Sequence, residues 1–132
     1  MEAHSMERWW EEHSELDQLV SGLAGALERS GVAAASAALE DLYDAMDAHF
    51  DAEEGVYFPL LERLSPTHGA TVKAAREGHA RIRGDLEKIR SHLSDEELDR
   101  ARGLMGELMV LFDDHEQAES RLIAELEQAV LA

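Results

Sequence analysis

The 132-residue sequence contains no cysteine, and this absence excludes several kinds of site at once. Without thiols there can be no disulfide, no thiolate zinc site, no iron–sulfur cluster and no cysteine nucleophile. Any metal ion would therefore have to bind through histidine, a carboxylate or tyrosine.

Basic residues are also scarce, since 12 Lys and Arg stand against 29 Asp and Glu, for a formal net charge of −17. So large an excess of negative charge repels nucleic acid and anionic membrane surfaces, and we expect neither as a partner. The sequence also lacks a bilayer-length apolar run and a basic-then-apolar leader. We therefore expect a soluble, cytoplasmic monomer with one domain over residues 1–132.

Proline occurs only twice and aromatic residues make up only 5% of the chain. Alanine, leucine, glutamate and arginine dominate instead, a composition that favours helices over strands. Long amphipathic helices with short connections predict an all-α, antiparallel up-down-up-down four-helix bundle. The four predicted helices span about residues 4–30, 33–63, 66–92 and 95–131.

Two of the breaks between these helices carry signals for a helix start. Ser65 followed by Pro66 is typical of an N-cap and a proline in the first turn. Ser94 with Glu97 three residues later has the pattern of a capping box. We therefore expect the third and fourth helices to begin directly after these serines.

Each predicted helix carries one apolar stripe at three-four spacing, and polar residues interrupt every stripe. Burying such groups is costly unless they have partners, and a metal ion is the usual common partner. One stripe histidine alone would more often be an ordinary core residue, but the whole set favours a metal site. The predicted site residues are His13, His49, Glu53, His79, His115 and Glu119.

The apolar stripe of the second helix also predicts how the helix continues after Glu53. It continues past Glu53 through Val56, Leu60 and Leu64, as an unbroken α-helix requires. Pro59 would bend this helix near its end.

Distances from the turns predict which stripe residues lie at the same height. His13 lies 18 residues before Gly31 and His49 lies 18 after it, so the two should be neighbours in an antiparallel pair. His49 lies 16 residues before Ser65 and His79 lies 14 after it. The first three helices can therefore bring their histidines together.

The fourth helix fits this count less well. His79 lies 15 residues before Ser94 but His115 lies 21 after it, a mismatch of about 9 Å. We expect residues 95–102 to form a bent or separate turn before Gly103, which would remove the mismatch.

A histidine and a glutamate four residues apart lie on one helix face, about 6 Å from each other. The pairs His49/Glu53 and His115/Glu119 can each offer a nitrogen and a carboxylate to one metal ion or to two adjacent ones. A carboxylate can bridge two cations, whereas an imidazole is a terminal ligand. Imidazole and carboxylate without thiolate suit iron first, with manganese or zinc as substitutes.

These residues resemble the hemerythrin-like (HHE) family. The resemblance rests on His-Phe-Asp-Ala-Glu-Glu at 49–54, Val-Tyr-Phe-Pro at 56–59 and His-Glu-Gln-Ala-Glu at 115–119, with single stripe histidines on the other two helices. It implies an antiparallel bundle around a non-haem di-iron centre that binds dioxygen or a related small molecule. By position it implies His13 and His49 on one iron, His79 and His115 on the other, and Glu53 and Glu119 as bridges.

The sequence departs from oxygen-carrying members of that family on the third helix. Those members have two histidines four residues apart there, whereas Ala75 and Arg83 flank His79 at these positions. The second iron would then have fewer protein ligands and room for water, peroxide or another ligand, with Arg83 extending to solvent. This disfavours simple reversible oxygen carriage and allows redox reactivity.

Three further residues fall beside the predicted site. Asp17, four residues after His13, is either an acceptor for the ring N–H or a solvated residue. Tyr57, four residues after Glu53, is more simply a packing residue than a hydrogen-bonding one. Trp9, one turn before His13, is a core residue that could wall the site.

Spacing excludes other kinds of site. No glutamate stands three residues before any of the four stripe histidines, as ferritin-like proteins require, and there is no His-Glu-x-x-His, phosphate loop or nucleophile elbow. Three functions stay open. They are a di-iron protein that binds dioxygen, peroxide or nitric oxide for sensing, scavenging or storage, a peroxide-consuming catalase- or peroxidase-like enzyme, and an iron buffer without a redox role.

Overall fold

The computed structural model describes residues 3–64 and 66–131, and nearly all of them are helical. Outside the turns at 30–31 and 95–97, every residue in these two ranges lies in a helix, and none lies in a strand. None of the described helices is apolar over a length that could cross a bilayer. The long helices are α1 (Ala3–Arg29), α2 (Val32–Ala52), α4 (Gly69–Ser94) and α5 (Leu98–Leu131).

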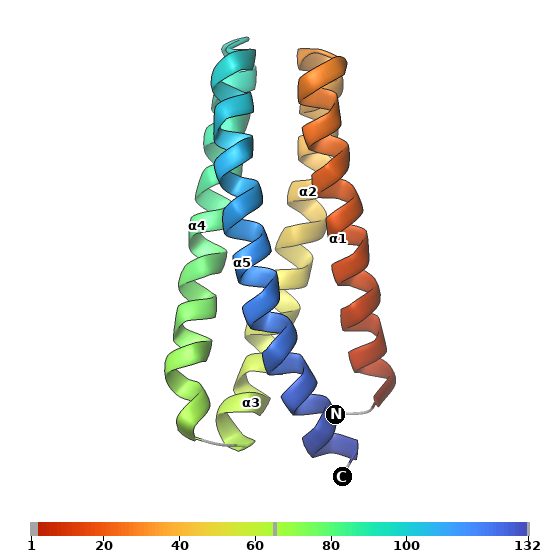
Figure 1. Ribbon diagram of the computed structural model, residues 1–132, viewed down its shortest axis with the longest axis vertical. Helices are drawn as coiled ribbons and strands as arrows, with labels where there is room; N and C mark the ends of the chain where they lie inside the picture. The colour runs from red at the N-terminus through yellow and green to blue at the C-terminus, as the bar shows by residue number, and fades with distance from the viewer. Residues whose placement is uncertain (1–2, 65, 132) are drawn as a thin grey trace.

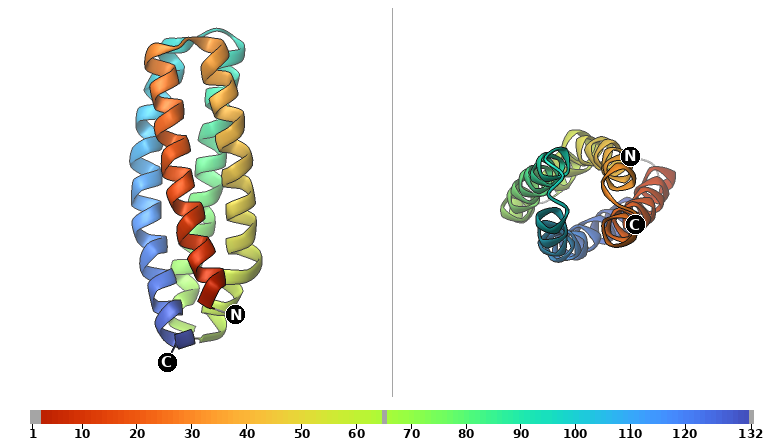
Figure 2. Two further views of the ribbon diagram at one scale, coloured as in Figure 1. Left: turned by 90° about the vertical axis from the view of Figure 1, so that its right-hand side faces the viewer. Right: turned by 90° about the horizontal axis from the view of Figure 1, so that it is seen from above.

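Successive long helices run in opposite directions along the molecule, so that α1 begins and α5 ends at the same end (Figure 1). Seen from above, the helices form a ring in which α1 packs against α2 and α5, and α4 packs against the same two helices (Figure 2). The predicted all-α, up-down-up-down four-helix bundle is therefore confirmed.

The turn between α1 and α2 falls at the predicted break. Gly31 has a φ of +85°, in the left-handed region that side chains rarely adopt and that glycine enters without strain. Its carbonyl accepts the amide of Ala35 at 3.1 Å, which starts α2.

The predicted capping box at Ser94 is wrong, because Ser94 is the last residue of α4. The chain closes α4 with a Schellman motif instead. Glu96 adopts a φ of +57°, its amide donates to the carbonyl of Leu93, and the amide of Glu97 donates to the carbonyl of His92. The side chain of Glu97 lies 3.0 Å from His92 Nδ1, so it is drawn to the end of α4 and α5 starts only at Leu98.

The start of α4 also differs from the prediction. The predicted N-cap, Ser65, lies outside the described residues. Pro66–His68 forms a short 3₁₀ turn, η2, and α4 begins at Gly69.

The expected bend after residue 95 is likewise absent, since α5 is one helix through Gly103. The later start of α5 removes most of the mismatch. His79 lies 15 residues before Ser94 and His115 lies 17 after Leu98, so two residues, or about 3 Å, remain.

A π-helical turn, η1 (Glu53–Tyr57), separates α2 from the short helix α3 (Phe58–Leu64). A π-turn holds an extra residue, so it rotates every later side chain relative to an α-helix. Val56 and Leu64, predicted to be core residues, are therefore 52% and 48% exposed. The residues buried in their place are Tyr57, Phe58 and Leu61.

Pro59 explains why the irregular turn lies here. A proline in a continuous α-helix would leave the carbonyl of Gly55, four residues earlier, without its amide partner and would clash with it. Gly55 lies inside η1, so the π-turn replaces the simple bend predicted near the end of the second helix.

Two apolar clusters fill the interior, one on each side of the six predicted site residues. The larger runs from Leu16 to Leu27 on α1 and through the matching stretches of the other long helices. The smaller contains Met6 and Trp9 with residues of η1, α3, α4 and α5. The polar level is thus enclosed by apolar packing above and below.

Leu61 and Leu64, two of the three leucines of α3, test the register that the π-turn sets. We expect Leu61→Ala, at a fully buried position, to lower the free energy of unfolding by about 2–5 kcal/mol. Leu64→Ala, at an exposed position of the same helix, should change it by about 0.5 kcal/mol or less. Urea denaturation of both variants measures the difference. A larger loss of unfolding free energy in Leu64→Ala than in Leu61→Ala would contradict the π-turn and favour an unbroken α-helix.

Candidate metal centre

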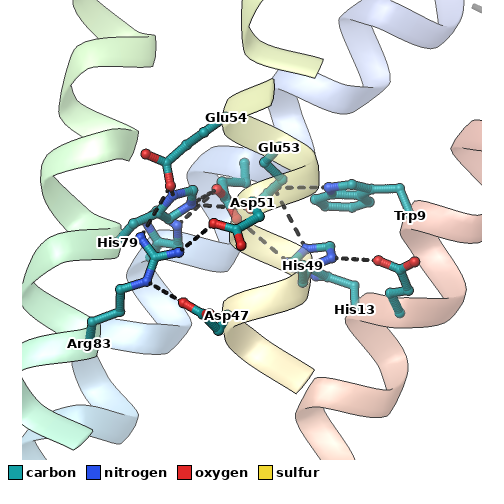
Figure 3. A network of polar contacts seen from close by, with 12 residues as sticks. Trp9, His13, Asp47, His49, Asp51, Glu53, Glu54, His79 and Arg83 are labelled. Carbon is teal, nitrogen blue, oxygen red and sulfur yellow. Dashed lines mark hydrogen bonds and ion pairs between the residues drawn. The ribbon is translucent and has the colours of Figure 1, made fainter. Parts of the chain in front are cut away.

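All six predicted site residues lie together in the interior of the bundle, and each is buried. Figure 3 shows His13, His49, Glu53 and His79 among them. Each long helix contributes a histidine, and the glutamates come from η1 and α5. Their ligating atoms form two overlapping groups, within each of which all atoms lie within 4.8 Å of one another. The groups are Glu53, His79, His115 and Glu119, and His13, His49 and Glu119.

Glu119 belongs to both groups because its two oxygens face different histidines. Oε2 lies 2.7 Å from His79 Nε2 and 2.9 Å from His115 Nε2. Oε1 lies on the other side, 3.8 Å from His13 Nε2. One carboxylate can therefore offer an oxygen to each of two cations.

Glu53 has a similar position on the opposite wall. Its Oε1 lies 3.1 Å from His79 Nε2, and its Oε2 lies 3.6 Å from His49 Nε2. The indole N–H of Trp9 donates to Oε2 at 2.9 Å and fixes the carboxylate (Figure 3). Trp9 also stacks on the His13 ring at 4.1 Å, so this core residue walls the site, a role that the sequence left open.

Three histidines direct Nε2 inward and hold a second carboxylate at Nδ1. The separations are 3.0 Å for His49 with Glu12, 3.1 Å for His79 with Glu54, and 3.1 Å for His13 with Glu116. Such a partner fixes the tautomer and orientation of a ligating imidazole. Sequence reasoning missed these glutamates, although each is adjacent in sequence to a predicted ligand, because each serves a histidine on another helix.

Glu116, and not Asp17, lies against His13 Nδ1, with its Oε1 at 3.1 Å. Asp17 instead contacts Glu116. Burial, the hydrogen bond with Asp17 and the charge of Asp17 raise the pKa of Glu116 to about 8. Tyr57 is buried in the smaller apolar cluster, and burial together with Glu12 and Glu53 raises its pKa, so it is a protonated phenol.

His115 depends on a glycine of α4. A Cβ atom added to Gly78 would lie 2.5 Å from His115 Nδ1, too close for any side chain. Glycine at this position therefore lets the imidazole of α5 approach the α4 backbone and reach the centre.

Four buried atoms at the centre make no hydrogen bond of good geometry among the described residues, although each lies 2.9–3.8 Å from a carboxylate oxygen or an imidazole nitrogen of the centre. They are His49 Nε2, His115 Nε2, Glu53 Oε1 and Glu119 Oε1. Leaving such atoms unsatisfied in an apolar interior costs free energy, and buried polar groups normally have partners. Imidazole nitrogens and carboxylate oxygens facing one small space are the ligands of a transition metal. These residues therefore fit a metal ion.

Without a metal, the centre holds protons. Burial opposes a charge on His79, but hydrogen bonds with Glu119 and Glu53 outweigh it and raise the pKa of His79 to about 9. Burial and the nearby Glu119 raise the pKa of Glu53 well above its usual value. Burial also disfavours the charge on Glu119, but His115, His13 and His79 hold the pKa of Glu119 low.

Two cavities open beside the centre with different linings. One of about 470 Å³ lies between α1 and α5, and polar residues such as His13, Asp17 and Glu116 line it together with Trp10. The other, of about 390 Å³, lies between α4 and α5, where small residues such as Ala75 and Gly78 line it beside His115. Each half of the centre thus has a space next to one of its histidines.

The positions flanking His79 differ in their surroundings. We expected Arg83 to extend freely to solvent. It instead pairs with carboxylates of α2 and η1. Ala75 lines the cavity next to His115. The cavity therefore leaves space for a further metal ligand beside His115 at Ala75, and not at Arg83.

The protons held by the centre predict a pH effect on the metal-free protein. A pKa raised from 6.5 to about 9 at His79 stabilises the fold fully below pH 6.5, and this stabilisation is lost as the pH rises through 9. The raised pKa of Glu116 acts in the same direction. We expect Tm of the metal-free protein to fall between pH 6.5 and 9, as measured by calorimetry.

His79→Gln is the control, and it should flatten this part of the profile. A Tm of the metal-free protein that rises over the same range would contradict the assigned protonation.

One family of known proteins matches most of the chain. The family described as "Hemerythrin HHE cation binding domain" matches residues 4–126, which include all six residues of the centre. No curated protein and no solved structure matches the chain. The chain belongs to the hemerythrin HHE cation-binding domain family.

Proposed function

We propose that this metal-binding, hemerythrin-type protein holds a non-haem di-iron centre. In this proposal His13 and His49 bind one iron, His79 and His115 bind the other, and Glu53 and Glu119 bridge them. The observation that carries it is the division of oxygens: each glutamate presents one oxygen to each histidine pair.

The donor set supports iron. Each half offers two imidazoles and carboxylate oxygen, the ligand type of non-haem iron sites that keep open positions. Manganese or zinc can use the same ligands and are substitutes. When bound, iron would supply Lewis acidity, redox capacity and coordination positions for dioxygen, peroxide or nitric oxide, whereas zinc would supply no redox capacity.

The residues of the chain prepare the centre for such a ligand. The glutamates that lie against Nδ1 of three histidines, here called the outer glutamates, orient the imidazoles. They are Glu12, Glu54 and Glu116. Trp9 orients Glu53. Apolar packing on both sides limits water, while the cavities beside His13 and His115 give small molecules a place to approach. We propose that binding such a molecule serves sensing, scavenging or storage; a monomeric state and a cytoplasmic location stay predictions from the sequence.

One observation favours an enzymatic use of the same centre. Ala75 stands where oxygen carriers can have a further histidine, and it lines the cavity beside His115. Fewer protein ligands on this side would favour peroxide consumption in a catalase- or peroxidase-like cycle over reversible oxygen carriage. An iron buffer without a redox role would use the same ligands but would react with neither molecule.

The bridging role predicts a stoichiometry. We expect two iron ions per chain in the reconstituted protein by elemental analysis, and one or none in Glu53→Ala and Glu119→Ala, because each removes a ligand from both ions. Glu107→Ala, at an exposed position on α5, is the matched control and should keep both ions. Full metal content in both bridge variants would contradict the bridging assignment.

The function itself is tested by offering each small molecule to the iron-loaded protein. We expect the visible spectrum to change when dioxygen or nitric oxide is added, because the donor set leaves coordination positions open. Reversal on removing the gas supports binding, and steady oxygen evolution from peroxide supports the enzyme. A spectrum that none of the three molecules alters would leave only the iron buffer.

A further inference from the structure

Arg83 lies on α4 one turn after His79, and its guanidinium holds three carboxylates across the helix interface (Figure 3). Nε lies 3.0 Å from Asp47 Oδ1, and Nη2 lies 3.2 Å from Asp51 Oδ1. Nη1 lies 3.3 Å from Glu54 Oε2. These acidic residues follow one another along α2 and η1, so Arg83 joins α4 to the segment that carries Glu54.

The contact with Glu54 leads directly to the metal centre. The oxygen that receives Arg83 Nη1, Oε2 of Glu54, also lies 3.1 Å from His79 Nδ1. A single carboxylate oxygen therefore connects the arginine to the imidazole.

The His79 ring is held on every other side. Phe50 stacks on one face at 3.8 Å with an interplanar angle of 10°, and Phe58 stacks at 5.5 Å and 19°. Nε2 faces the two glutamates of the centre. The aromatic rings fix the plane of the imidazole, and the partner of Nδ1 holds the proton on that nitrogen when Nε2 binds a metal ion.

No arginine contacts the other two outer glutamates within the described part of the chain. Glu12, which pairs with His49, has a side chain 38% exposed, and Glu116 contacts Asp17. Glu54 is the outer glutamate that an arginine orients.

We propose that Arg83 is a positioning residue for the metal centre: it fixes Glu54 so that His79 keeps its proton on Nδ1 and presents Nε2 to the metal. The inference rests on the proposed ligand role of His79. Ion pairs this close to solvent contribute little to stability, so the role of Arg83 lies in orientation.

Arg83→Gln tests the proposal, and Arg90→Gln is its matched control. Arg90 lies on the same helix and pairs with Glu40 and Glu87, away from the centre. Zinc serves as a diamagnetic probe, with affinity measured against a competing chelator. Loss of an outer partner lowers metal affinity about 10- to 100-fold, and we expect about 3- to 10-fold for Arg83→Gln because it acts one step further out.

Two measurements separate positioning from a loss of structure. In the zinc-loaded protein, the Nδ1–H signal of His79 should exchange faster with water in Arg83→Gln than in Arg90→Gln, as nitrogen-edited NMR would show. Arg83→Lys keeps the charge but not the planar fork, and should recover only part of the affinity.

The double variant of Arg83→Gln with Glu54→Gln tests whether Arg83 acts through Glu54. If Arg83 acts through Glu54, then Arg83→Gln should weaken zinc binding in the parent protein and add nothing once Glu54 is replaced. Equal losses in both backgrounds would overturn the proposal, as would equal zinc affinities of Arg83→Gln and Arg90→Gln. A parent protein that binds no zinc would instead overturn the metal centre itself, and the role of Arg83 with it.

Discussion

The burial of two carboxylates and four imidazoles between apolar clusters is the constraint on which the rest of the structure depends. Glu53 and Glu119 are fully withdrawn from solvent and lie near each other, so their charges need compensation inside the bundle. Protons at His79 and Glu53 supply it in the metal-free protein. Divalent cations would supply it more completely, because they would also satisfy the buried nitrogens and oxygens that make no hydrogen bond of good geometry.

The helices meet this constraint through local departures from regularity. The π-turn begins at Glu53, and along it one glutamate faces the centre while its neighbour, Glu54, reaches the outer nitrogen of His79. Gly78 allows α4 and His115 to come close. Each outer glutamate supports a histidine of a neighbouring helix, so the polar groups around the centre also tie the helices to one another.

The periodic part of this architecture could be predicted from the sequence, and the aperiodic part could not. Three-four spacing predicted the bundle and the six residues that meet in it, although their role as ligands stays a prediction. It failed after Glu53, because a π-turn breaks the three-four period there. The capping-box motif at Ser94 also gave a wrong prediction, because a Schellman motif and the contact of Glu97 with His92 close α4 there instead. The outer glutamates were hidden among 29 acidic residues, since only the folded bundle shows which of them face a histidine.

X-ray absorption at the iron edge of the reconstituted protein tests the central claim most directly, because it reports the neighbours of each iron. Carboxylates that share their oxygens between two histidine pairs would hold two ions about 3.5–4 Å apart. The account predicts a metal–metal scattering contribution in that range, together with imidazole and carboxylate ligands, and its loss in Glu119→Ala. Iron coordinated by histidine and carboxylate without a second metal in that range would contradict a bridged pair.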